Sequence, residues 1–146
     1  MSEEINEEVK KFMATISKEW IDSLPQPVVE ECEGFHIVRE DLINGGSKVR
    51  ASDYFVSILK DIEELVYGSC PATGHAQIAL SVLAKRYGKK AVVFMAKRAL
   101  DKLTEQQKHA IREGVDFRWV NMGMLNVTES RARKYAEKSE KRILVP

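Results

Sequence analysis

The stretch NGGSKVR at 44–50 places two glycines and a serine directly before a lysine. Glycine adopts backbone conformations that other residues avoid, so Gly45 and Gly46 predict a tight turn that a flat ligand can approach closely. A helix pattern follows the turn and puts Lys48 in the first helical turn, where the positive end of the helix dipole favours a neutral amine. A neutral amine is the nucleophile that forms a Schiff base with a carbonyl compound. The ordinary alternative is a solvated surface lysine.

A second group of reactive side chains lies in the loop YGSCPATGH at 67–75. Thr73 offers a hydroxyl group, and His75 stands at the start of the next expected helix. The histidine serves either in proton transfer and loop positioning or only as a neutral residue at a helix start. Cys70 is a reactive thiol if its surroundings lower its pKa, and otherwise a small buried apolar residue.

Two charged segments have two interpretations each. Glu40 and Asp41 follow Arg39 and either support the lysine turn by hydrogen bonds or form a turn at a strand end. The segment RARKYAEKSEKR at 131–142 is basic, but glutamates interrupt it. This pattern favours a solvated helix face over a nucleic-acid site.

Composition indicates one soluble domain. The chain has 146 residues, 44% of them hydrophobic and 31% charged, which is enough for a core of its own. A net charge of +1 gives no electrostatic reason to expect nucleic acid or an anionic membrane as a partner. No apolar run approaches the about 20 residues that span a bilayer. The two cysteines, Cys32 and Cys70, lack metal-ligand spacing, which is typical of a cytoplasmic protein with reduced thiols.

Hydrophobic periodicity predicts the elements that position these residues. We expect an N-terminal helix within 1–24 and a single α/β domain over 25–146. The first half should contain a helix over 4–22 ended by LPQP, a strand at 35–40, a helix from Val49 to Val66, and a helix over 75–87 with Gly88 as its cap. The second half should contain strands at 91–96, 115–120 and 142–146, with Trp119 of the second strand in the core. Between them we expect a helix over 105–113 with Thr104 and Gln107 as a capping box, and a helix from a cap at Asn126 to about 139.

The order of these elements predicts the fold class. Strands and helices alternate with short connections after residue 91, and the run AVVFMA is continuous and apolar, as in buried parallel strands. The expected fold is α/β, with a parallel sheet flanked by helices. The last apolar strand coincides with the end of the chain, which favours a fold truncated at its C-terminus.

Two blocks of the sequence resemble a known family. VREDLINGGSKVRA at 38–51 resembles the lysine segment of fold-type-II pyridoxal-phosphate enzymes. The nearest resemblance is to the aminocyclopropane-carboxylate deaminase and D-cysteine desulfhydrase group, including a short branch found in phage and bacterial genomes. The block from YGSCPATGH to FMAKR at 67–98 resembles the family's Ser-Asn-His loop with its helix and strand. Over about 25–146, the resemblance implies a partial fold like that of tryptophan synthase β.

The resemblance also implies a cofactor and its ligands. Lys48 falls on the lysine that holds pyridoxal 5′-phosphate as a Schiff base. The implied cofactor-binding residues are Lys48, Gly45, Gly46, Ser47, Thr73, Gly74 and His75. Gly74 departs from the family, which has an asparagine there that donates a hydrogen bond to the cofactor ring. The family's phosphate loop falls beyond residue 146.

Three functions remain open. One is a pyridoxal-phosphate-dependent lyase or deaminase-like enzyme acting on a small amino acid or an amino-acid-modified substrate, with Lys48 as base. Deamination, desulfhydration and β-elimination are not distinguished. The second is a catalytically incomplete accessory or assembly protein that needs a complementing chain. In either case we expect a homo-oligomer or a partner chain and no membrane. The third, a nucleotide-binding domain, lacks a GxGxxG or P-loop signature.

Overall fold

A computed structural model describes residues 18, 21–121 and 123–146 of the chain. The helix predicted over 4–22 lies almost entirely outside these residues, and Ile21 and Asp22 at its end adopt no regular secondary structure. None of the described helices is long and apolar enough to cross a membrane.

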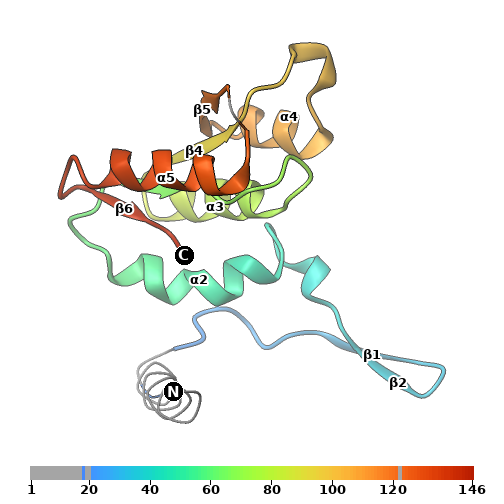
Figure 1. The fold of residues 1–146 in the computed structure, drawn as a ribbon. Helices are drawn as coiled ribbons and strands as arrows, with labels where there is room; N and C mark the ends of the chain where they lie inside the picture. Colours follow the sequence, from blue (N-terminus) through green and yellow to red (C-terminus); the bar gives the residue numbers. More distant parts are fainter. Residues whose placement is uncertain (1–17, 19–20, 122) are drawn as a thin grey trace, which may run out of the picture.

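The centre of the fold is a four-stranded parallel sheet (Figure 1). Its strands are β3 (Glu64–Tyr67), β4 (Lys90–Ala96), β5 (Asp116–Val120) and β6 (Arg142–Leu144), in the spatial order β5-β4-β3-β6. Every neighbouring pair is parallel. The fold class predicted from the sequence, α/β with a parallel sheet flanked by helices, is therefore confirmed.

Helices cover both faces of this sheet. They are α2 (Ser47–Ile58), α3 (Ala76–Arg86), α4 (Glu105–Arg112) and α5 (Leu125–Ala136). On one face Leu65 and Val93 belong to the larger core, which α2, α3 and α4 complete. On the other face Val66 and Val92 pack against α5. Since neighbouring residues of a strand point to opposite faces and both faces are covered, β4 reads as a continuous apolar run.

The helix predicted from Val49 to Val66 is wrong in its second half. α2 ends at Ile58, and Glu64–Tyr67 forms β3, which lies between β4 and β6. Leu65 and Val66 are adjacent and both completely buried, as expected for a central strand with two covered faces. The spacing of apolar residues did not reveal this, because a short apolar run fits a helix and a buried strand equally well.

The strand expected at 35–40 is confirmed as β2 (Phe35–Val38), but its partner β1 (Val29–Cys32) was not anticipated. The two strands form an antiparallel hairpin that extends away from the parallel sheet (Figure 1). Its loop residues Glu33 and Gly34 have φ of 49° and 82°. Positive φ at both loop residues is what a two-residue hairpin turn requires.

Two further predictions needed correction, while one was confirmed. α4 begins with the predicted capping box of Thr104 and Gln107. α5 begins after Met124, so Asn126 lies inside the helix and does not cap it. Trp119 is 38% exposed and stacks on Phe117 of the same strand. It is not a core residue, because β5 is an edge strand with a neighbour on one side only.

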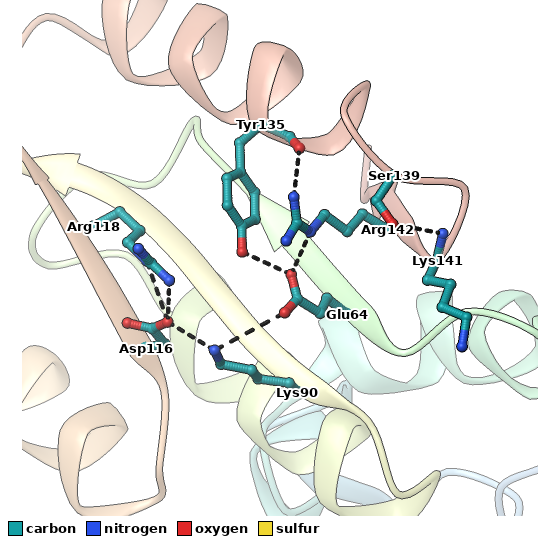
Figure 2. A network of polar contacts seen from close by, with 8 residues as sticks. All are labelled: Glu64, Lys90, Asp116, Arg118, Tyr135, Ser139, Lys141 and Arg142. Carbon is teal, nitrogen blue, oxygen red and sulfur yellow. Dashed lines mark hydrogen bonds and ion pairs between the residues drawn. The ribbon is translucent and has the colours of Figure 1, made fainter.

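A row of charges joins the amino ends of the strands (Figure 2). Arg142 Nε donates to Glu64 at 2.8 Å, and Lys90 Nζ lies 3.0 Å from Asp116. The hydroxyl of Tyr135, on α5, also donates to Glu64, and the Arg142 guanidinium lies 4.0 Å from the centre of the Tyr135 ring. Opposite charges alternate along the row, so it holds the strands in register. Ligand sites in open parallel sheets lie at the other, carboxyl, edge.

Candidate functional site

Lys48 lies where the glycine turn predicted from the sequence leads into a helix. Gly46 has φ 78° and immediately precedes α2, so Lys48 is the second residue of the helix. Gly45 has φ 88°, and a Cβ atom there would lie 2.6 Å from Val49 Cγ2 and 3.3 Å from the Ala79 Cα. The turn therefore requires glycine at position 45 for its backbone conformation and for its close packing on α3.

Lys48 lines a hollow at the carboxyl edge of the sheet. The hollow has a volume of about 210 Å³. Its lining comes from α2 (Lys48, Ala51, Ser52), the end of β3 (Tyr67), α3 (Ala76, Ala79, Leu80, Leu83) and the residues after β6 (Val145, Pro146). Lys48 is the one charged residue in this lining. Open α/β sheets bind ligands in this region, outside the carboxyl ends of their strands.

Lys48 has no carboxylate partner in the described part of the chain. The residue is exposed. The nearby Arg50 is paired with Asp22 and Glu40, whereas no carboxylate in the described part of the chain forms an ion pair with Lys48.

Arg50 ties the lysine helix to the segment before it. Its Nη1 lies 2.7 Å from Asp22, its Nε 3.0 Å from Glu40, and its Nη2 donates to the carbonyl oxygen of Pro25 at 2.9 Å. Glu40 thus supports the lysine segment, which is one of the two interpretations of the Glu40–Asp41 pair. Asp41 instead forms a bidentate pair with Arg39.

Asp53 ties the same helix to α3 and was missed by the sequence reasoning. Its residue is 2% exposed, and its carboxylate accepts hydrogen bonds from Ser23, from Arg86 Nη1 at 2.5 Å and from the Tyr87 hydroxyl at 2.9 Å. Burial by itself raises the pKa of Asp53, but these donors outweigh it and hold the pKa below its usual value. The available signal was an aspartate on the buried face of α2, four residues after Val49.

The loop before α3 is held by Gln77. The side chain of this buried residue donates to the carbonyl oxygens of Ala72 at 3.0 Å and Gly74 at 2.8 Å. Thr73 and His75 are exposed, and His75 precedes α3 without a side-chain cap bond. Neither they nor Gly74 line the hollow that contains Lys48, although the adjacent Ala76 does.

Gly74 and Cys70 are packed together in this loop. A Cβ atom at Gly74 would lie 3.0 Å from the Pro71 carbonyl oxygen and 3.2 Å from the Cys70 sulfur, so an asparagine there would need the loop to shift. Cys70 is 2% exposed. Burial raises the pKa of its thiol, while the backbone N–H of Gln77 and the charge of Lys48 lower it in part. The net shift is upward, which supports the interpretation of Cys70 as a buried, unreactive residue.

A second hollow adjoins the first across Tyr67. It has a volume of about 450 Å³, and its polar side chains are Tyr67, Ser69, Glu129 and Arg133. Ser69 Oγ donates to Glu129 at 3.0 Å, and Arg133 Nη2 lies 3.2 Å from the same carboxylate. Burial raises the pKa of the Tyr67 phenol, so its hydroxyl stays protonated at neutral pH. The sequence reasoning missed these residues because β3, which Tyr67 ends, was predicted to be helix.

The described residues provide no metal centre, since no group of three or more His, Cys, Asp or Glu side chains in them is placed to hold an ion.

Comparison with known proteins supports the fold. No protein-family description matches the chain, and no curated protein matches it. Among solved structures, it is similar to the crystal structure of a fungal L-serine ammonia-lyase from Rhizomucor miehei, with a TM-score of 0.57 and 19% identity. The match covers 76% of this chain and 34% of the ammonia-lyase chain, so the protein spans about a third of that enzyme. At this identity, the likeness establishes the α/β fold alone.

Proposed function

We propose that the chain is the lysine-bearing part of a pyridoxal-phosphate-dependent lyase or deaminase-like protein that acts on a small amino acid. The observation that carries this proposal is the position of Lys48. The Lys48 amine has no carboxylate partner among the described residues, and Lys48 lines a hollow at the carboxyl edge of a parallel sheet. The similar fold of an L-serine ammonia-lyase supports lyase chemistry on an amino acid.

The residues around the hollow fit the carbonyl and ring end of the cofactor. Lys48 would hold it through its amine. Tyr67 and the apolar side chains Leu80 and Leu83 provide a wall that suits a flat aromatic ring. The hollow's lining contains no cluster of converging N–H groups for the phosphate beyond the start of α3 at Ala76, so a second chain or further residues would complete that part of the site.

When bound, pyridoxal phosphate supplies an electron sink for the electron pair left at the substrate α-carbon. The chain's own contribution is positioning and proton transfer. The Lys48 amine, once free, removes the proton from the α-carbon as general base. The protonated Tyr67 hydroxyl and the Ser52 hydroxyl are the polar groups in the lining that orient a substrate by hydrogen bonds.

The proposal is tested by locating the covalent adduct. The purified chain is incubated with pyridoxal phosphate, reduced with borohydride, digested and analysed by mass spectrometry. We expect modification concentrated on Lys48 and lost in Lys48→Ala. Lys60→Ala is the matched control, because Lys60 is another exposed lysine, two residues after the end of α2. Equal labelling of many surface lysines, unchanged in Lys48→Ala, would refute the assignment.

The second candidate function is a catalytically incomplete accessory or assembly protein that needs a partner chain. The packing of Gly74 against Pro71 and Cys70 favours it, because the asparagine expected from the resemblance would fit there only if the loop shifted. It predicts that the adduct forms at Lys48 while small amino acids, serine included, release neither ammonia nor a keto acid. Turnover by the isolated chain would exclude it.

A further inference from the structure

The hollow around Lys48 is small for the ligand that would react there. It holds about 210 Å³, whereas pockets for small molecules usually hold about 300–1,000 Å³. The second hollow, of about 450 Å³, adjoins it and shares three lining residues with it, namely Tyr67, Val145 and Pro146. The two hollows together fall within the usual range for a ligand pocket. The second hollow is therefore the available extension of the lysine site.

The polar end of the second hollow is built by close packing between the end of β3 and α5. Gly68 directly follows β3, and a Cβ atom there would lie 2.6 Å from Ala132 Cβ and 2.7 Å from Glu129 Cα. Thr128 is 1% exposed, and its hydroxyl donates to the carbonyl oxygen of Gly68 at 2.5 Å. A side chain at position 68 would push α5 away from the strand end. The backbone of Glu129 is therefore held next to β3.

Two donors hold the Glu129 carboxylate in this hollow. Ser69 Oγ donates to one carboxylate oxygen at 3.0 Å, and Arg133 Nη2 donates to the other at 3.2 Å. A carboxylate has about four acceptor positions, so in the described part of the chain each oxygen can accept one more hydrogen bond. Burial and, to a smaller degree, the charges of Cys70 and Glu129 raise the pKa of the Tyr67 phenol, which lines the same hollow. The charge of Arg133 balances that of Glu129, so the hollow suits an uncharged polar group.

We propose that Glu129 determines substrate specificity at the lysine site, by accepting a hydrogen bond from an uncharged polar group, such as a hydroxyl, on the substrate side chain. This inference rests on the proposed function, because it takes Lys48 as the group that reacts with the substrate. Ser69 positions the carboxylate, and the Tyr67 hydroxyl offers a donor on the wall that the two hollows share. A site built in this way discriminates against an analogue that lacks the hydroxyl, because the polar groups that face it lose their partner.

Binding of L-serine and L-alanine, which differ by one hydroxyl group, tests the proposal. Each amino acid is titrated into the isotope-labelled chain, both as isolated and after pyridoxal phosphate has been fixed on it by borohydride reduction, and the backbone amide signals are followed by NMR. In at least one of these two forms, L-serine should shift the signals of Ser69 and Glu129 and bind about 10-fold more tightly than L-alanine. In Glu129→Ala this preference should disappear while the affinity for L-alanine stays unchanged. Glu129→Gln keeps an acceptor oxygen and should retain part of the preference.

Glu137→Ala is the matched control. Glu137 caps the C-terminal end of the same helix and does not line the second hollow. This variant should therefore bind both amino acids as the wild type does. Circular dichroism establishes that all variants are folded.

Three results would overturn the proposal: a wild type that binds L-serine no better than L-alanine in both forms, a Glu129→Ala variant that keeps the preference, or a Glu137→Ala variant that loses it. Mass spectrometry of the reduced chain separates this inference from the proposed function. A preference that depends on Glu129, without an adduct at Lys48, would support the second hollow as a binding site and refute the proposed function. An adduct at Lys48 without the preference would support the proposed function and refute the role of Glu129.

Discussion

Removal of the Asp53 carboxylate should destabilise the protein and loosen the helix that carries Lys48. In Asp53→Ala, the donors Ser23, Arg86 and Tyr87 lose their common acceptor. Breaking a buried ion pair costs about 3–5 kcal/mol, but the Arg86 side chain is 39% exposed and can be rehydrated. We therefore expect a loss of about 2–3 kcal/mol in the free energy of unfolding.

Urea denaturation followed by circular dichroism measures this loss, and the thermal midpoint should fall by about 5–12 °C. Asp53→Asn should lose less, because its amide oxygen still accepts hydrogen bonds. Asp101→Ala, at an exposed position, should stay within about 0.5 kcal/mol of the wild type. If Asp53→Ala is as stable as Asp101→Ala, the assignment of Asp53 as the link between α2 and α3 is wrong.

The pH dependence of stability provides a second measurement on the same group. The pKa of Asp53 in the folded protein lies below its usual value, about 3.9 in an unfolded chain. Its contribution is therefore fully present above the unfolded-state pKa and is lost as the pH falls through the lower folded-state pKa. The difference in stability between wild type and Asp53→Asn should be constant from neutral pH to about pH 5 and shrink below about pH 4. A difference that persists at low pH would contradict this account.

Three further predictions follow from single residues. Gly45→Ala should lower the free energy of unfolding, measured by urea denaturation, by about 2 kcal/mol or more, because φ is positive and the added Cβ atom would lie 2.6 Å from Val49 Cγ2. Gly46→Ala should lower it by only about 1 kcal/mol, because φ is also positive but the added Cβ atom meets open space. Ellman's reagent at neutral pH should modify the exposed Cys32 much faster than the buried Cys70, and equal rates would contradict the described burial. Thr104→Ala should cost about 1–2 kcal/mol in thermal or urea unfolding, because it removes both the cap of α4 and the hydrogen bond to Ala72; Thr104→Ser should restore most of it.

Local signals in the sequence were sufficient for several elements. The capping box at Thr104 and the apolar run of β4 depend on residues that are neighbours in the chain, and both predictions are confirmed. β3 was misassigned because its four residues continue the helical spacing of α2, and only burial on both faces identifies it as a strand. The hairpin partner of β2 was missed because the turn has an unusual first residue, Glu33, in a conformation that favours glycine or asparagine.

The sequence by itself determined the presentation of Lys48. Gly45 and Gly46 permit the turn, and the helix pattern after them places the lysine at the helix start, since both features depend on local backbone preferences. Tertiary structure alone decided what surrounds the amine. Tyr67, Leu83 and Pro146 line the same hollow as Lys48 because β3 lies between β4 and β6, which brings strand ends and helices from distant parts of the chain to one edge. Contacts of this kind depend on the order of the strands in the sheet, and the spacing of residues along the chain does not determine that order.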